Sequence, residues 1–248
     1  MHVEIIGTTS AGKTTLARKM VKAGKNNGVE VFLSDDFMLE KVHLGWIKNE
    51  FIRRRLVEAV AFGVWLTCLP KYKDFYNFVV REGQYSPGSW FYKLNRIRNV
   101  VRKIGIFEFI ARKSGSGQVI LVDNEGILQG VHNLFVHQDS FADLSKIPSY
   151  VELVPLPDVI LYLKPDEDVL VSRTLVRGHA RVGSDQDKVV HFIKQATCVF
   201  DEMAKMPVIQ EKLLVANGEL DIEYADKDQG KENFQRVVEL VRSGSVLS

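Results

Sequence analysis

The strongest structural signal in this chain is an eight-residue motif near its start. Residues 7–14 read G-T-T-S-A-G-K-T and follow directly on an apolar run at residues 3–6. In this pattern small residues let consecutive backbone N–H groups turn inward around phosphate oxygens, and the helix that follows adds its positive end. The motif needs a strand in front and a helix behind. The sequence therefore predicts an α/β fold with a polyphosphate site; the alternative is an ordinary glycine turn.

The side chains of this loop have distinct expected roles. Lys13 would place a positive charge against the β- and γ-phosphates of a nucleotide, and the Thr14 hydroxyl would ligate Mg²⁺. The phosphates are expected to lie against Gly7, Thr8, Thr9, Ser10, Ala11, Gly12, Lys13, Thr14 and Thr15. The loop alone does not distinguish a kinase from a GTPase or an ATP-driven motor.

Short apolar runs separated by helical patterns are typical of a buried parallel sheet. The expected strands are residues 3–6, 29–33, 119–122, 159–163 and 213–216. The expected helices outside the long segment 38–117 are residues 12–26, 165–177 with Gly178 as its stop, 185–206 and 232–242. This alternation predicts a three-layer α/β fold with a five-stranded parallel sheet and helices on both faces.

Residues 38–117 form a long segment between the second and third expected strands, and we interpret it as a helical insertion in one domain. An apolar stripe of Ile47, Phe51, Leu56 and Val60 predicts its first helix. Residues 74–81 predict a second helix and residues 90–113 a third, broken at Gly105.

The insertion is expected to act as a cap that binds the acceptor. Aromatic rings could stack on a base, and arginines could hold an acidic substrate. The alternative is that the aromatic residues belong to the core and the arginines are solvated. These residues are Arg53, Arg54, Arg55, Arg81, Tyr85, Trp90, Phe91, Tyr92, Arg96 and Arg98.

Composition gives no sign of a nucleic-acid or membrane partner. The net charge of +2 is too small to indicate a nucleic-acid or membrane partner. The longest uncharged stretch, residues 59–70, is too short to span a bilayer and is expected to be a buried helix. Cys68 and Cys198 match no metal spacing and are expected to be reduced core residues. A strand that begins next to Met1 leaves no room for a signal peptide, so the expected compartment is the cytoplasm.

Two carboxylates follow the second expected strand, in the run Leu33-Ser34-Asp35-Asp36-Phe37. The carboxyl ends of parallel strands form the ligand crevice of an α/β sheet. A carboxylate there is placed to accept a proton from a hydroxyl that attacks the γ-phosphate. Asp35 and Asp36 are therefore candidates for the general base; alternatively, one of them caps the next helix.

Acidic residues also follow the third expected strand, in the run Asp123-Asn124-Glu125-Gly126. An acidic residue at this strand end commonly holds Mg²⁺, directly or through water. Asp123 and Glu125 are both candidates for this role, and the alternative is a solvated turn.

Three arginines follow the fourth expected strand. Arg173 and Arg177 are four residues apart on one expected helix and share a face, and Arg181 lies in the glycine-bounded loop beyond it. A mobile arginine loop could close over the phosphates and stabilise the transferring group, an effect worth on the order of 10³–10⁵ in rate. The alternative is a surface helix paired with acidic residues such as Asp168.

Together these pieces resemble the P-loop nucleoside and nucleotide kinases. Ser34-Asp35-Asp36-Phe37 and Glu125-Gly126-Ile127-Leu128 are most similar to the uridine kinase group and its nicotinamide riboside kinase relatives. The fourth strand and its arginine helix look equally like thymidylate kinase and the deoxynucleoside kinases. The resemblance covers most of the chain except residues 38–117. It implies a single P-loop kinase domain over residues 1–248, with Asp35 at the base position and Glu125 at the acidic position.

The leading hypothesis is an ATP- and Mg²⁺-dependent kinase that phosphorylates a small-molecule hydroxyl, with a nucleoside as the favoured acceptor. Three alternatives are a thymidylate-like nucleoside monophosphate kinase, a nucleotide-dependent switch and a polynucleotide 5′-kinase. The chain lacks both the Asp-Arg pair by which thymidylate kinases hold their acceptor phosphate and the guanine-reading Asn-Lys-x-Asp motif. The resemblance implies ATP rather than GTP. The oligomeric state stays open, with a homodimer as one alternative.

Overall fold

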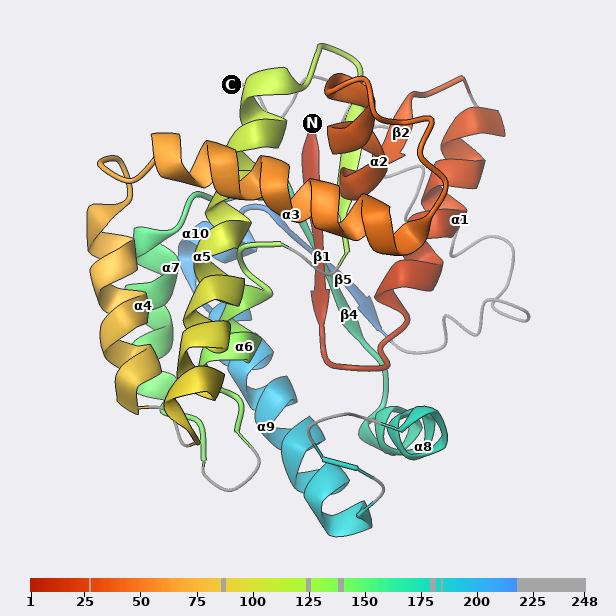
Figure 1. Ribbon diagram of the computed structural model, residues 1–248. Helices are drawn as coiled ribbons and strands as arrows, with labels where there is room; N and C mark the ends of the chain where they lie inside the picture. Colours follow the sequence, from red (N-terminus) through yellow and green to blue (C-terminus); the bar gives the residue numbers. More distant parts are fainter. Residues whose placement is uncertain are drawn as a thin grey trace.

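The sheet is parallel throughout and has five strands (Figure 1). It belongs to a computed structural model that describes residues 1–26, 28–85, 88–123, 126–137, 141–178, 182–183 and 185–217. The strands are β1 (His2–Gly7), β2 (Val31–Leu33), β3 (Val119–Val122), β4 (Val159–Lys164) and β5 (Leu213–Asn217), in the spatial order β2-β3-β1-β4-β5. The predicted five-stranded parallel sheet is confirmed.

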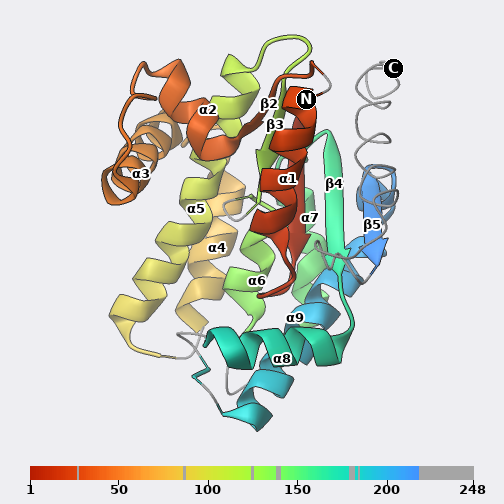
Figure 2. The same ribbon diagram turned by 90° about the vertical axis from the view of Figure 1, so that its right-hand side faces the viewer.

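Helices cover both faces of this sheet. They are α1 (Lys13–Asn26), α2 (Ser34–Lys41), α3 (Glu50–Thr67), α4 (Lys73–Tyr85), α5 (Trp90–Lys113), α6 (Gly130–Phe135), α7 (Ile147–Leu153), α8 (Glu167–Arg177), α9 (Gln186–Ala204) and α10 (Pro207–Gln210), with a 3₁₀ turn η1 (Leu144–Lys146). Figures 1 and 2 show α1 on one side of the sheet and α5, α6, α7 and α9 on the other. Because both faces are covered, every residue of β1 is buried.

The helix predictions outside the insertion are largely correct. Residues 189, 192, 193, 196 and 200 of α9 are all buried, as their spacing predicts. Gly178 ends α8 with φ 69°, a backbone conformation that glycine adopts without strain. The last predicted helix, residues 232–242, lies outside the described residues. Among the described helices, none has the length and apolar character needed to cross a lipid bilayer.

The helical insertion consists of α3, α4 and α5, which connect α2 to β3. The predicted break at Gly105 is wrong, because α5 is continuous through that position. Gly105 instead permits a close crossing of α3 and α5. A Cβ atom there would lie 1.9 Å from the carbonyl oxygen of Ala61 on α3. A glycine that resembles a helix break in the sequence is thus a contact point between two helices.

We expect Gly105→Ala to lower the free energy of unfolding by about 1–3 kcal/mol, because the added methyl group forces α3 and α5 apart. The matched control is Gly63→Ala on α3, where an added Cβ meets nothing within 4 Å. That change should raise stability by about 0.5–1 kcal/mol, since alanine favours the helix. Urea unfolding of both variants measures the difference, and equal stability of the two would contradict this description of the crossing.

Three other sequence expectations need correction. Phe51 was expected on the buried stripe of α3 but is 69% exposed, and Ile47 precedes the helix. The buried residues of α3 are Val57 and Ala61, because the close crossing at Gly105 selects a face with a small side chain.

The uncharged stretch 59–70 is buried on one side only, since the hydrophobic side chains of residues 62, 66 and 69 are exposed. Cys68 is buried as expected, whereas Cys198 lies exposed on the outer face of α9.

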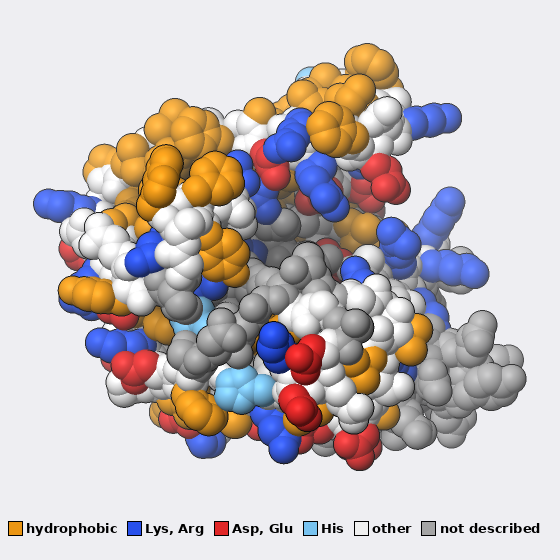
Figure 3. Space-filling model, turned by 60° about the horizontal axis from the view of Figure 1, so that its bottom comes forward, with side chains coloured by type: hydrophobic (Ala, Val, Ile, Leu, Met, Phe, Trp, Pro, Cys, Tyr) orange, Lys and Arg blue, Asp and Glu red, His pale blue; other side chains and the backbone are white. Residues whose placement is uncertain are grey.

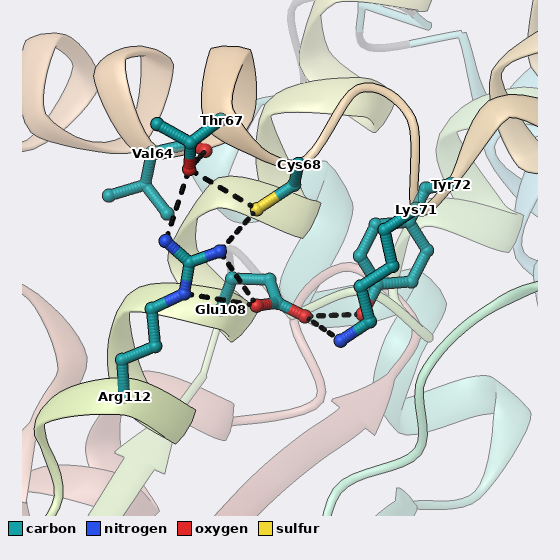
Figure 4. A network of polar contacts seen from close by, with 7 residues as sticks. All are labelled: Val64, Thr67, Cys68, Lys71, Tyr72, Glu108 and Arg112. Carbon is teal, nitrogen blue, oxygen red and sulfur yellow. Dashed lines mark hydrogen bonds and ion pairs between the residues drawn. The ribbon is translucent and has the colours of Figure 1, made fainter.

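A polar network fastens the connection between α3 and α4 to α5 (Figure 4). The buried Glu108 carboxylate accepts hydrogen bonds from the Tyr72 hydroxyl and, at 2.6 Å, from Lys71 Nζ. Arg112 donates to Glu108 at 3.2 Å and to Cys68 Sγ at 2.9 Å. Burial would raise the pKa of Glu108, but the hydrogen bonds from Lys71 and Tyr72 outweigh it and lower that pKa. Glu108 is therefore an ionised residue of α5 that holds the connection between α3 and α4 in place.

Candidate nucleotide and acceptor site

The motif at residues 7–14 forms the loop between β1 and the start of α1. Three of its residues have positive φ, namely Gly7 at 144°, Ser10 at 63° and Gly12 at 93°. A Cβ at Gly7 would lie 2.6 Å from the carbonyl oxygen of Leu163, so only glycine fits there. Because α1 begins at Lys13, the N–H groups of its first turn lie at the end of the loop. This backbone has the features that an anion-binding loop requires.

Lys13 lies folded over this loop. Its Nζ atom donates hydrogen bonds to the carbonyl oxygens of Gly7, at 2.9 Å, and Thr8, at 2.8 Å. Burial lowers the pKa of Lys13 to about 8; Asp123 opposes this effect, and Lys103 and Arg177 add to it. The ammonium group is therefore held close to an acidic residue from β3 and to a basic residue from α8.

Asp35 and Asp123 meet at the carboxyl edge of the sheet. Asp35 lies in the first turn of α2, directly after β2, and Asp123 directly follows β3. Since β2 and β3 are paired neighbours, their ends lie side by side. The two aspartates line one cavity of about 100 Å³, whose other lining residues come from α3 and α5: Arg54, Val57, Glu58, Ala61, Arg102 and Ile106. The structure thus brings Asp35, a candidate for the general base, and Asp123, a candidate metal ligand, together beside α3 and α5 of the insertion.

Asp36, the second base candidate, has a different environment. Its carboxylate forms an ion pair with Arg53 of α3, and its side chain is 55% exposed. It is not one of the described residues that line the cavity. The structure therefore separates the two neighbouring aspartates, and Asp35 is the better-placed proton acceptor.

The cavity contains a pair that the sequence analysis missed. Glu58 of α3 accepts a hydrogen bond of 2.7 Å from Arg102 of α5, and it also pairs with Arg55 at 3.0 Å. Because Glu58 and Arg102 are 44 residues apart, no local pattern relates them. Arg54, by contrast, makes no hydrogen bond or ion pair with another described residue. The side of the cavity formed by the insertion therefore carries one paired guanidinium group, that of Arg102, and one without a partner among the described residues, that of Arg54.

Helix α8 brings Arg177, one of the predicted arginines, within electrostatic range of Lys13. Arg177 is near enough to Lys13 to lower its pKa. Arg173 precedes it by one turn, and the fully buried Thr174 donates a hydrogen bond of 3.1 Å to the Ser10 hydroxyl. This contact attaches α8 to the phosphate loop. Arg181 and Glu125, also predicted as site residues, lie outside the described residues.

The oxygen-bearing side chains around the phosphate loop suit a magnesium ion that binds together with a nucleotide. Within the described part of the chain, no cluster of three or more His, Cys, Asp or Glu residues could hold a metal by itself. Mg²⁺ does not need such a cluster, because it commonly binds through one or two protein ligands, substrate phosphates and water. Thr14, in the first turn of α1, and Asp123, within electrostatic range of Lys13, are the candidates that would provide these two oxygen ligands.

The aromatic residues expected to stack on a base do not line the cavity. Tyr85, Trp90 and Phe91 are 71–81% exposed. Trp90 precedes Arg102 by about 18 Å along α5, at 1.5 Å per residue. The predicted arginines in this region have local partners, since Arg96 binds the Tyr92 hydroxyl at 3.2 Å and Arg98 binds Asn95. Figure 3 shows the hollow face of the molecule, with basic and acidic side chains along its upper border.

No protein-family model matches the chain, and no curated protein is similar to it in sequence. Similar solved structures include deoxyadenosine kinase from M. mycoides with dCMP and a flexible dCDP bound (15% identity, 98% of this chain, 100% of that chain, TM-score 0.47). The same kinase with bound dATP is 15% identical, covering 96% and 100%, with a TM-score of 0.46. Shikimate kinase from Acinetobacter baumannii in complex with shikimate is 11% identical, covering 98% and 93%, with a TM-score of 0.42. The site residues of this chain are therefore assigned from its own geometry.

Proposed function

We propose that this protein is a kinase that transfers the γ-phosphoryl group of ATP to a hydroxyl of a small molecule. The observation that carries the proposal is the juxtaposition of three parts: a glycine-rich loop with a buried lysine, an aspartate beside that lysine, and a second aspartate in the same cavity. A site that only binds a nucleotide needs the first two parts. The cavity with Asp35 adds a place for an acceptor and a group to take its proton.

The chain's own residues divide the reaction as follows. The loop backbone and Lys13 hold the β- and γ-phosphates, and Arg177 adds positive charge from α8. Thr14 and Asp123 would hold the Mg²⁺ that accompanies ATP and neutralises phosphate charge when bound. Asp35 accepts the proton of the acceptor hydroxyl. The oxygen of that hydroxyl forms a bond to the γ-phosphorus, while the bond between the γ-phosphorus and the β–γ bridging oxygen breaks. The products are the phosphorylated acceptor and ADP.

A nucleoside is the first acceptor class we propose. The support is the resemblance of residues 34–37 and 125–128 to nucleoside kinases, together with the polar lining of the cavity. Arg102, Glu58 and Arg54 offer hydrogen-bond donors and acceptors suited to a molecule rich in hydroxyl and amide groups. The insertion thus serves as the acceptor-binding cap through α3 and α5 rather than through the aromatic residues near residue 90.

A nucleoside monophosphate is the second candidate acceptor, and one observation favours it. Arg54 lines the cavity without a partner among the described residues, and a guanidinium group of this kind can bind a phosphate in a bidentate manner. We expect Arg54→Gln to abolish activity on a monophosphate and to change activity on a nucleoside only slightly. The opposite order of effects would remove this candidate.

A panel of nucleosides, nucleoside monophosphates and short oligonucleotides, with ADP release as the readout, tests the proposed function. We expect ADP release to depend on one of the first two classes. If ATP is hydrolysed at a rate that none of these acceptors changes, and the protein has a stable protein partner, a nucleotide-dependent switch would be favoured. Stimulation by oligonucleotides alone, with binding that weakens strongly with salt, would favour a polynucleotide 5′-kinase.

The affinity for MgADP is expected to be level up to about pH 8 and to fall by up to about tenfold per pH unit above it. The empty protein has a neutral Lys13 above its pKa of about 8, whereas a bound polyphosphate favours the ammonium form. Binding at higher pH therefore requires uptake of a proton. Calorimetry over this range measures the slope. Lys13→Arg, whose guanidinium stays charged, should give a flat profile, and an unchanged slope in that variant would assign the titration to another group.

A further inference from the structure

Gln129 holds both backbone polar groups of Gly7, the first residue of the phosphate loop. Its side-chain oxygen accepts a hydrogen bond of 3.3 Å from the Gly7 N–H, and its side-chain nitrogen donates one of 3.2 Å to the Gly7 carbonyl. Gln129 is itself 8% exposed, and all four groups are buried. A paired contact of this kind holds the two peptide groups on either side of the Gly7 Cα from a segment 122 residues away in the chain.

The segment that carries Gln129 is wrapped around a buried carboxylate of β1. Glu4 is fully buried and accepts a hydrogen bond of 2.8 Å from the Gln129 backbone N–H. Burial raises the pKa of Glu4 to about 7, and the backbone of Gln129 and the charge of Lys103 oppose this. A Cβ at Gly126 would lie 2.1 Å from the Glu4 carboxylate, so the turn after β3 fits around this group only with glycine. The turn is thereby fixed directly beneath the loop.

The Gly7 carbonyl has a second partner, and this partner is Lys13. The ammonium group donates to the same oxygen at 2.9 Å. The ammonium has a third N–H for a phosphate, and a movement toward a β- or γ-phosphate in the loop would lengthen its contacts with these two carbonyls. A buried carbonyl left without any donor is unfavourable, which would hold the lysine back.

We propose that Gln129 is a positioning residue that keeps the Gly7 carbonyl hydrogen-bonded when Lys13 turns to the nucleotide phosphates. It touches neither the nucleotide nor the acceptor; it acts on the loop and on Lys13. Glu4 and Gly126 hold it in place. This inference rests on the proposed function, since it assigns a role in binding ATP.

The test compares two buried glutamines. In Gln129→Leu the Gly7 carbonyl depends on Lys13 alone, and we expect the Kd for MgADP to rise about tenfold, the effect of leaving one buried polar group without its partner. The control is Gln195→Leu on α9. That glutamine is 5% exposed and accepts a hydrogen bond of 2.6 Å from the Ala142 N–H, remote in sequence from the loop. It should lose comparable stability and keep its affinity for MgADP.

A hydrogen-exchange measurement and a second variant test the role of Gln129 separately from its effect on stability. Hydrogen exchange at the Gly7 amide should accelerate in Gln129→Leu and stay unchanged in Gln195→Leu, which a general loss of stability would not produce. If Gln129→Leu does not fold, Gln129→Met replaces it; the thioether keeps the length of the side chain but has no donor for the Gly7 carbonyl, so the same tenfold loss is expected.

Binding of MgADP by the wild-type protein separates the positioning role of Gln129 from the proposed kinase function. If the wild-type protein binds MgADP and the Gln129 variants bind it equally well, the positioning role of Gln129 is wrong and the proposed kinase function stands. If the wild-type protein takes up no MgADP, the proposed function is wrong and the role of Gln129 falls with it.

Discussion

Lys13→Ala is expected to reduce kcat/KM for ATP by at least about 10²–10³-fold, the loss that follows removal of one preorganised donor at a site of developing charge. Lys13 lies folded over the loop, with its ammonium on the carbonyls of Gly7 and Thr8. Neither Arg177 nor Thr14 can replace a point charge placed inside the loop. ADP release in the presence of the identified acceptor measures the effect.

Two controls accompany this variant. Lys22→Ala removes an exposed lysine from the same helix and should leave the rate unchanged. A thermal melt of Lys13→Ala checks that the loss of the two loop hydrogen bonds has not unfolded the protein. A folded Lys13→Ala variant with ordinary turnover would show that the phosphates bind elsewhere.

Asp35→Asn is expected to reduce kcat by about 10²–10⁴-fold, the usual contribution of a general base, with little change in nucleotide affinity. The substitution keeps the size of the side chain and one acceptor oxygen, replaces the other oxygen by an NH₂ donor, and removes the ability to accept a proton. Single-turnover kinetics with the identified acceptor separate this chemical step from binding.

The matched control for Asp35→Asn is the neighbouring Asp36→Asn. Asp36 is paired with Arg53 and is largely exposed, so its loss should change kcat by less than about threefold, in line with the small energies of exposed ion pairs. Full turnover in Asp35→Asn would rule out the proton-acceptor role. A large loss in Asp36→Asn alone would transfer that role to the second aspartate.

The sheet could be predicted from the sequence because its signals are local. Each strand is a short apolar run, and covered parallel strands give such runs whatever surrounds them. The end of α8 at Gly178 and the buried face of α9 follow from equally local rules. The insertion was less predictable because its packing is decided between helices. Gly105 resembles a break until Ala61 of another helix is placed against it.

The site residues with local sequence signals could also be predicted, whereas those whose partners are distant in the chain could not. The phosphate loop and the aspartates at the ends of β2 and β3 could be found because loop spacing and strand ends are visible in a single sequence. Gln129 and the pair of Glu58 with Arg102 could not, because their partners are far away in the chain. Glu4 was part of an apolar run with no sign that its carboxylate would be buried beneath the loop.

One titration decides whether this loop binds a nucleotide at all. Calorimetry of the purified protein with ATP and Mg²⁺, under conditions without acceptor, should show one site per chain with a Kd between about 1 μM and 1 mM, the range of working nucleotide sites. The same titration of folded Lys13→Ala should show no measurable uptake. No heat of binding in the wild-type protein, or equal binding by both proteins, would contradict the assignment of residues 7–14 as the phosphate site.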